Sequence, residues 1–203
     1  AECIQSYHLL GGTTPSSSQI CGHRKRCTQS KKWPDQYWQK LAMLAVADGY
    51  KVKLLWGNQE ELERSKAIAR AAVNVEILSQ QSLTDVARLL GSCAGVVAVD
   101  TGLGHLAAAL SVPVISLYGA SNPVLTGAYG RHQLHLNSSM ACAPCVNKSC
   151  TWQGEPRIDV LGGNSFQVAP ACYRDNPPEL VWAKFKDLCA NGKGTLDSFF
   201  YPD

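Results

Sequence analysis

The stretch VDTGLGHLAAAL, Val99–Leu110, places an acid, a hydroxyl, glycines and a histidine between two apolar segments. The apolar run before Asp100 predicts a buried strand, and the residues that follow predict a helix. In open parallel sheets, ligands bind beyond the carboxyl ends of the strands, where loops lead into helices. The N–H groups of Gly102, Leu103 and Gly104 would lie at the positive end of this helix. The stretch therefore predicts an anion site suited to a phosphate or diphosphate.

Two side chains of this stretch are candidates to contact such a ligand. Asp100 could accept hydrogen bonds from sugar hydroxyls, and His105 lies one turn into the helix, at the same opening. The alternative is a plain strand-to-helix turn, in which Asp100 caps the helix and His105 is an ordinary surface residue. The motif by itself leaves both interpretations open.

Two further stretches are expected to reach the same edge of the sheet. Lys31 and Lys32 directly precede a predicted helix start, where an ammonium group could meet phosphate oxygens. Glu60 and Glu61 follow the predicted strand 51–56, and an acid at that place can bind vicinal ribose hydroxyls. The alternatives are solvated lysines and first-turn acids that only favour the helix dipole, which is the better interpretation of Glu60.

An alternation of strand and helix patterns from Trp33 onward predicts the scaffold for these residues. Nearly continuous apolar segments, typical of strands buried on both faces, alternate with amphipathic helical segments. We therefore predict an α/β fold, a parallel sheet with helices on both faces. The predicted strands are 51–56, 75–78, 95–100, 112–119 and 133–136, and the predicted helices are 33–50, 58–72, 82–93, 102–110 and 177–189.

Residues 1–30 fit this scaffold least well. They contain the linker-like GGTTPSSSQ and the basic HRKR, and we predict an irregular basic leader there. Residues 1–32 hold five basic side chains and one acid, so the rest of the chain carries −1 of the total charge of +3. No nucleic-acid partner is therefore expected. The other predicted ranges are a binding domain over 31–190, with a cysteine-rich loop section at 142–172, and a tail over 191–203.

Composition bounds the class of protein and its compartment. The chain has 203 residues, of which 45% are hydrophobic and 17% charged, as in ordinary soluble globular proteins. No apolar run approaches the ~20 residues that span a bilayer, and the N-terminal segment lacks the basic start of a signal peptide. Nine cysteines cannot all pair within one chain, and a reducing compartment fits them better. We therefore expect a cytoplasmic protein.

Four cysteines have a spacing that could hold a metal. Cys142, Cys145 and Cys150 form a C-x2-C-x4-C pattern, and Cys172 follows in the same loop-rich section. Four thiolates could bind a structural Zn²⁺. A disulfide and free buried thiols are the alternatives.

Five segments in one order and spacing resemble a known family. They are KKWP…W (31–38), WG…E (56–61), SL…VA (82–87), VDTGLGHLAAAL and YGASNP (118–123). The combination is similar to the C-terminal half of the lipopolysaccharide heptosyltransferases, glycosyltransferase family 9, nearest to their heptosyltransferase I branch. The likeness covers residues 31–190. It implies a GT-B enzyme, with two Rossmann-like domains facing a cleft and the nucleotide sugar held by the C-terminal one.

The resemblance also implies a reaction and a set of roles. The donor would be ADP-L-glycero-D-manno-heptose, and heptose would pass with inversion to Kdo on lipid A, at the inner face of the inner membrane, without a cofactor. Lys31 would meet the diphosphate and Glu61 the ribose. Asp100 and His105 would contact the heptose or its phosphate. The implied anion-binding turn consists of Thr101, Gly102 and Leu103.

Two departures from the family pattern limit this prediction. The family's general base is an aspartate of the N-terminal acceptor domain, which this chain lacks, so we expect an incomplete enzyme that reaches the lipid A–Kdo acceptor through that missing domain. Before Lys31 the sequence reads ICGHRKRCTQS, in which only Thr28 and Ser30 could supply the hydroxyls expected there. The alternatives are a GT-B domain for another nucleotide sugar, such as a UDP-sugar, and a non-catalytic nucleotide-binding or interaction module.

Overall fold

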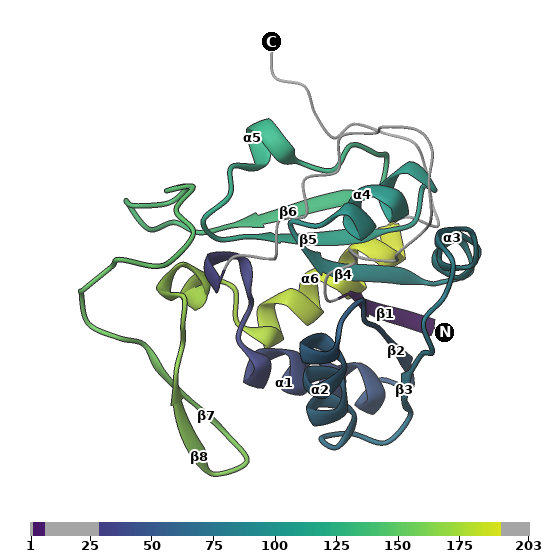
Figure 1. Cartoon of the computed structure of the whole chain (residues 1–203), viewed down its shortest axis with the longest axis horizontal. Helices are drawn as coiled ribbons and strands as arrows, with labels where there is room; N and C mark the ends of the chain where they lie inside the picture. Colours follow the sequence, from purple (N-terminus) through teal and green to yellow (C-terminus); the bar gives the residue numbers. More distant parts are fainter. Residues whose placement is uncertain (1, 7–28, 192–203) are drawn as a thin grey trace.

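A computed structural model of the chain describes residues 2–6 and 29–191, which form a parallel six-stranded sheet, a small hairpin and surrounding helices (Figure 1). The strand order in the large sheet is β3-β2-β1-β4-β5-β6, and every neighbouring pair is parallel. This order is that of the doubly wound dinucleotide-binding folds. The strands are β1 (Glu2–Ser6), β2 (Lys51–Leu55), β3 (Val75–Ile77), β4 (Gly95–Val99), β5 (Val114–Tyr118) and β6 (Gln133–Asn137).

The position of β1 corrects the prediction for residues 1–30. This strand lies in the middle of the sheet, where Cys3 is in register with Val52 of β2 and Gly95 of β4. An irregular leader is therefore wrong for residues 2–6. The segment is too short for a pattern of its own, and the two flanking strands supply the hydrogen-bond partners that make it a strand. Residues 7–28, with the linker-like and basic stretches, lie outside the described residues.

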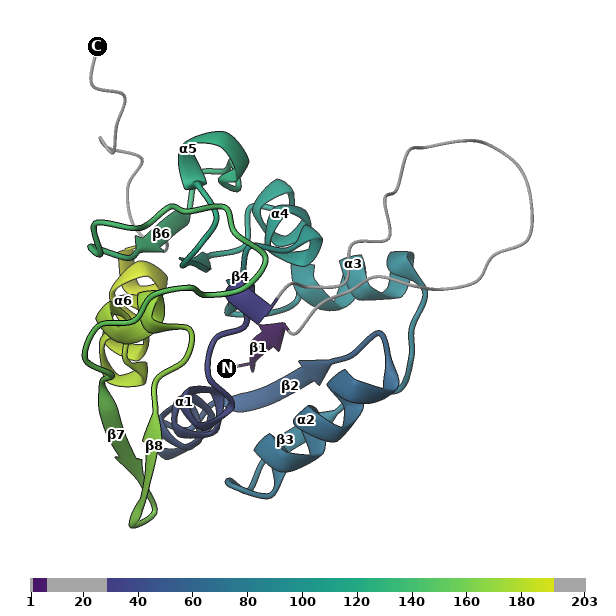
Figure 2. The ribbon, with the colours of Figure 1, turned by 60° about the vertical axis from the view of Figure 1, so that its left-hand side comes forward.

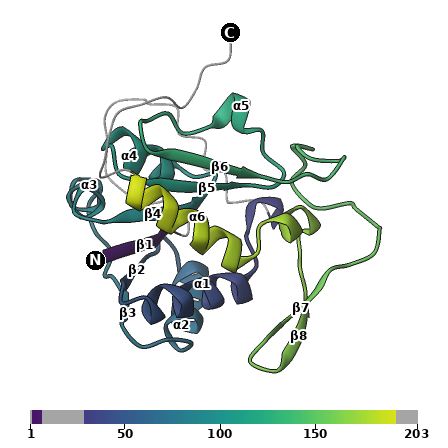
Figure 3. The same ribbon diagram turned by 180° about the vertical axis from the view of Figure 1, so that it is seen from behind.

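Helices cover both faces of the sheet, as predicted. One apolar cluster joins α1 (Asp35–Ala47), α2 (Gln59–Ala69) and α6 (Pro178–Asn191) to one face, and α1 and α6 are seen on it in Figure 3. A second cluster joins α3 (Leu83–Gly91) and α4 (Gly102–Ala109) to the opposite face (Figure 2). Within β4, Val97 and Val99 belong to the first cluster, and Val96 and Ala98 to the second. This alternation is what a strand buried on both sides requires.

The start of α3 shows how a cap and a packed face are arranged in this helix. Ser82 is the N-cap, and its hydroxyl accepts a hydrogen bond from the amide of Asp85 at 3.2 Å. Val86 and Leu90 are buried, whereas Leu83, which helical spacing puts on the same face, is 68% exposed. Leu83 is the first residue of the helix, and its side chain leans toward the N-terminus, off the end of the packed face.

The loop-rich section predicted at 142–172 contains a hairpin that the sequence analysis missed. Strands β7 (Ile158–Leu161) and β8 (Asn164–Gln167) pair antiparallel. Gly162 and Gly163 join them with φ angles of 57° and 81°, which a tight primed turn demands and glycine permits. The Gly-Gly pair was the signal for this turn. No helix in the described part of the chain is long and apolar enough to cross a membrane.

Candidate functional site

The structure brings Lys31 and Asp100 into direct contact at the carboxyl edge of the sheet. Asp100 directly follows β4, and the Lys31 Nζ lies 2.5 Å from its Oδ2 atom. The Asp100 side chain is only 7% exposed, whereas that of Lys31 is 34% exposed. The short 3-10 helix η1 (Gln29–Lys31) delivers the lysine to this place. An ammonium group therefore stands at the mouth of the site and a nearly buried carboxylate stands behind it.

The N-terminus of α4 follows this pair immediately. Thr101 is the N-cap with extended backbone, and its side chain makes no capping hydrogen bond. The first hydrogen bond along the helix runs from the amide of His105 to the carbonyl of Thr101 at 3.4 Å, so the amides of Gly102, Leu103 and Gly104 precede the helix's own ladder. Asp100 does not cap the helix in this structure, because its carboxylate pairs with Lys31.

Thr101 carries a buried hydroxyl without a partner. The residue is 6% exposed, and its Oγ1 atom has no hydrogen-bond partner in the described structure. A buried polar atom without a hydrogen bond costs about 1–3 kcal/mol. Such an atom, next to amides that the helix does not use, indicates a place prepared for a polar group from outside the chain.

At the turn, Gly102 is exposed to solvent, whereas Leu103 and Gly104 are buried. Gly102 is exposed, and a Cβ added to it would meet nothing within 4 Å, so a ligand can approach its backbone. Leu103 is buried in the core, which leaves its amide as its contribution to the site. A Cβ on Gly104 would lie 3.5 Å from the Ala98 Cβ, so this glycine brings α4 close to β4.

Glu61 lies at the same edge but is engaged in capping α2. Its Oε2 accepts a hydrogen bond from the amide of Gly57 at 2.8 Å, while its own amide donates to Asn58 Oδ1 at 3.0 Å. The side chain is buried, and burial raises the pKa of Glu61, although hydrogen bonds from Gly57 and Asn58 oppose this. Strand β1 separates β2 from β4, so the two strands that lead to Glu61 and Asp100 lie about 10 Å apart. The structure assigns Glu61 a capping role, and the ribose role stays a prediction.

Lys32 and Glu60 form a pair of their own. Their Nζ and Oε1 atoms are 2.5 Å apart, and Glu60 is largely exposed. An exposed ion pair of this kind contributes little to stability. Lys32 and Glu60 therefore have each other as ion-pair partners, and the interpretation of Glu60 as a first-turn acid stays a prediction.

His105 is exposed on α4, and its ring makes no hydrogen bond or ion pair with the described residues of this edge. It lies close enough to His135 of β6 for its charge to lower the pKa of that histidine, after burial, which is the larger cause. The structure thus places His105 on the helix that opens the site, on the side toward β6. Its contact with a sugar stays a prediction.

The four predicted metal ligands line one small cavity. Cys142, Cys145, Cys150 and Cys172 surround a space of about 20 Å³, and all four are free thiols. Burial, followed by the neighbouring thiols, raises the pKa of Cys172 to about 12. Sulfur donors suit Zn²⁺ by their chemistry. However, no three His, Cys, Asp or Glu side chains in the described ranges lie close enough together to hold a metal ion. The zinc site stays a prediction that this arrangement does not support.

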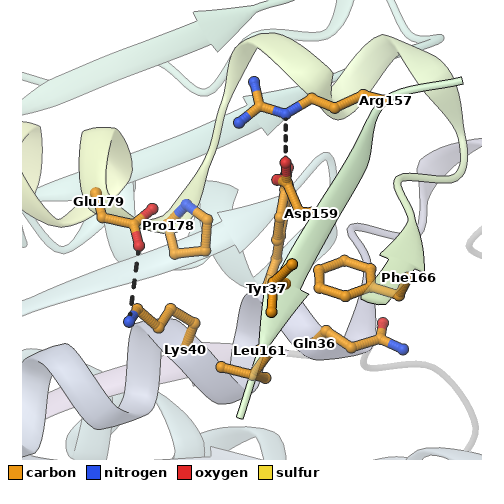
Figure 4. A pocket seen from close by; sticks show the side chains of 10 residues that line it. Gln36, Tyr37, Lys40, Arg157, Asp159, Leu161, Phe166, Pro178 and Glu179 are labelled. Carbon is orange, nitrogen blue, oxygen red and sulfur yellow. Dashed lines mark hydrogen bonds and ion pairs between the residues drawn. The ribbon is translucent and has the colours of Figure 1, made fainter. Parts of the chain in front are cut away.

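A separate pocket lies beside the β7–β8 hairpin (Figure 4). Here Arg157 Nε lies 2.7 Å from Asp159 Oδ1, the hydroxyl of Tyr37 donates to the other oxygen of Asp159, and Lys40 pairs with Glu179 at 3.9 Å. Burial and the contact with Asp159 raise the pKa of Tyr37. Burial opposes ionisation of Asp159, but its hydrogen bonds from Arg157 and Tyr37 outweigh burial and lower its pKa. This network fastens the hairpin to α1.

A parallel sheet in this strand order, with an acid–lysine pair and an open helix N-terminus at its carboxyl edge, defines a domain of the Rossmann-like class. The model of glycosyltransferase family 9 (heptosyltransferase) matches residues 19–155. The chain therefore belongs to this family, which confirms the resemblance found in the sequence.

Two curated relatives are lipopolysaccharide heptosyltransferases 1. The one from Pseudomonas aeruginosa is 49% identical over 124 residues, which are 61% of this chain and 35% of the relative. The one from Escherichia coli K12 is 45% identical over 104 residues, which are 51% of this chain and 33% of the relative. The chain thus spans about a third of the length of these relatives.

Solved structures support the fold. Escherichia coli heptosyltransferase WaaC with ADP is 35% identical with a TM-score of 0.53, over 66% of this chain and 36% of that one. The Escherichia coli ADP-heptose heptosyltransferase II matches 95% of this chain and 47% of its own, with a TM-score of 0.64 and 20% identity, which speaks for the fold alone. The predicted α/β fold, a Rossmann-like parallel sheet with helices on both faces as in these glycosyltransferase structures, is confirmed.

Proposed function

We propose that this chain is the donor-binding domain of a lipopolysaccharide heptosyltransferase, and that its donor is ADP-L-glycero-D-manno-heptose. Family membership and the likeness to a heptosyltransferase solved with ADP support this proposal. The reaction would transfer heptose with inversion to Kdo on lipid A. A further domain would bind the acceptor and supply the general base. The enzyme would work in the cytoplasm, at the inner face of the inner membrane.

The observation that carries the proposal is the Lys31–Asp100 pair beside the uncapped end of α4. The diphosphate would lie on the amides of Gly102 and Leu103, where the helix dipole favours negative charge. The unpartnered Thr101 hydroxyl would donate to a phosphate oxygen, and the half-exposed Lys31 ammonium would meet the same group. Asp100, behind the lysine, would accept hydrogen bonds from the heptose hydroxyls.

This arrangement favours the departure of ADP. When the bond between the sugar carbon and the phosphate oxygen breaks, negative charge grows on the diphosphate. Fixed amides, a helix dipole and one ammonium stabilise that charge without having to reorganise. The residues of this chain would therefore lower the barrier through the leaving group, while the nucleophile is activated from the other side of the cleft.

The ribose would lie toward α2. Glu61 lies on that side, beyond the end of β2, which is two strand spacings, roughly 10 Å, from the strand β4 that leads to Asp100. Its carboxylate, already directed by Gly57, would accept hydrogen bonds from the ribose hydroxyls. His105, exposed on the first turns of α4, would contact the heptose or its phosphate.

Calorimetry with ADP and with UDP tests the proposal on the chain as it is. We expect heat of binding with ADP, weaker binding with UDP, and little or no turnover of ADP-heptose by this domain alone. Glu60→Gln is the matched control for variants at Glu61 and should bind ADP like the wild type, because Glu60 neighbours Glu61 in sequence but pairs with Lys32. A folded wild-type chain, checked by circular dichroism, that binds no ADP contradicts the proposal.

A further inference from the structure

The backbone that carries Lys31 is tied to the cysteine-rich loop on one side. Ser30, directly before it, is 2% exposed. Its hydroxyl donates to the carbonyl of Asn147 at 2.5 Å, and its amide donates to the carbonyl of Lys148 at 3.4 Å. The sequence analysis offered Ser30 as one of two residues that could supply a hydroxyl before Lys31. The structure directs this hydroxyl into the protein instead, toward the loop between Cys145 and Cys150.

On the other side, Lys31 itself is held by Tyr173. The Tyr173 hydroxyl donates to the backbone carbonyl of Lys31 at 2.9 Å. Tyr173 belongs to the short helix η2 (Ala171–Asp175) and is buried in the core. Gly119, just after β5, leaves room for Tyr173, because a Cβ at position 119 would come within 2.6 Å of Cys172 Sγ and 3.0 Å of the Tyr173 ring. The tyrosine can approach Lys31 because position 119 has no side chain.

The residue after Lys31 and Lys32 is also anchored. The indole of Trp33 donates through Nε1 to the carbonyl of Asn176 at 3.1 Å, and Trp33 is fully buried. Every one of these ties leads to the segment 147–176, which lies more than a hundred positions away in the sequence. A lysine side chain is long and flexible, so the position of its ammonium depends on a fixed backbone.

We propose that Tyr173 and Ser30 are positioning residues for Lys31. Through these two residues the segment 147–176 sets the affinity of the site for diphosphate. This inference rests on the proposed donor-binding function. Neither residue touches the ligand. They hold the backbone of η1 so that the Lys31 ammonium stands beside Asp100 and the amides of α4, and the ordering of the lysine is completed before the ligand arrives.

The test compares ADP with AMP, since the contribution of Lys31 grows with the charge of the phosphate group. Tyr173→Phe removes only the hydroxyl, and we expect it to lower the ADP-to-AMP affinity ratio about fivefold, the value of one hydrogen bond of about 1 kcal/mol. Ser30→Ala should act in the same direction and keeps the test open if Tyr173→Phe fails to fold. Lys31→Gln should give the largest fall in the ratio.

Tyr37→Phe is the matched control, because it removes another tyrosine hydroxyl, one that bonds Asp159 at the hairpin. Its ADP-to-AMP ratio should equal that of the wild type. An unchanged ratio in folded Tyr173→Phe and Ser30→Ala, while Lys31→Gln lowers it, overturns the inference and leaves the donor-binding proposal intact. Equal losses for ADP and AMP also overturn it, because they indicate general damage. A wild-type chain that binds neither nucleotide contradicts the donor-binding proposal itself.

Discussion

Two regions of this molecule hold a carboxylate against a cation, yet they differ in what remains unsatisfied. At the hairpin, Asp159 accepts from Arg157 with one oxygen and from Tyr37 with the other. At the carboxyl edge, Asp100 accepts from Lys31, and the neighbouring Thr101 hydroxyl is buried without a partner. The first region is complete within the chain, whereas the second keeps a buried hydroxyl without a hydrogen-bond partner in the described structure.

The comparison shows which feature sets the proposed binding site apart from the hairpin. Charge pairs occur in both regions and therefore do not distinguish them. The surplus of donors at the start of α4, together with open space at Gly102, is found at the edge. Buried polar groups are nearly always satisfied in folded proteins, so a surplus of this kind indicates a ligand.

We expect the largest effect on ligand binding from Asp100→Ala. If Asp100 binds the sugar, affinity for ADP-heptose should fall at least about tenfold, since hydrogen bonds to a charged group contribute roughly 1.5–3 kcal/mol. Affinity for ADP should fall less, because ADP lacks the heptose. Calorimetry with both ligands measures the difference. Equal affinities of the variant and the wild type for ADP-heptose contradict the assigned role.

Asp159→Ala should lower the stability of the chain and leave nucleotide binding nearly unchanged. It leaves the buried Tyr37 and the Nε of Arg157 without this acceptor, so the free energy of unfolding should fall by roughly 1–3 kcal/mol. ADP affinity should change little, because no residue of the hairpin network is among the proposed contacts of the nucleotide. Urea unfolding and calorimetry check the two halves of this prediction. Glu63→Ala, at an exposed pair with Lys66, is the control and should alter stability little.

Glu61→Gln tests a residue that has a structural role, in capping α2, and a proposed binding role, at the ribose. The amide oxygen can still accept from Gly57, so the cap of α2 should persist. The loss of the carboxylate should weaken ADP binding about fivefold, the value of one hydrogen bond of about 1 kcal/mol. An unchanged Kd for ADP would leave Glu61 as a cap alone.

The smallest expected effect is a dependence of stability on pH. Because burial raises the pKa of Glu61 above its ordinary value of 4.5, the folded chain holds this proton more tightly than the unfolded chain does. The contribution of Glu61 to stability is therefore greatest below 4.5 and falls as the pH rises through the raised pKa. The difference in unfolding free energy between the wild type and Glu61→Gln should decline over that range in urea titrations. A flat difference contradicts a raised pKa.

Much of the fold could be predicted from the sequence because it depends on local patterns. The strands from β2 to β6 and the long helices have apolar periodicities that their neighbours only reinforce, and predicted and observed ends differ by a few residues. β1 could not be predicted, because five residues become a central strand only through β2 and β4 on either side. The hairpin was missed, although its Gly-Gly turn was visible in the sequence.

From the sequence alone one can derive the order of the strands β2 to β6 and of the long helices, the glycine turn that opens α4, and the family to which the chain belongs. These follow from the types of neighbouring residues and from their spacing. Only the tertiary structure decided that Lys31 meets Asp100, that Lys32 and Glu60 pair with each other, and that Ser30 turns inward. Such contacts join residues distant in the chain, and no local pattern records which of two adjacent side chains will face a partner once the elements have packed.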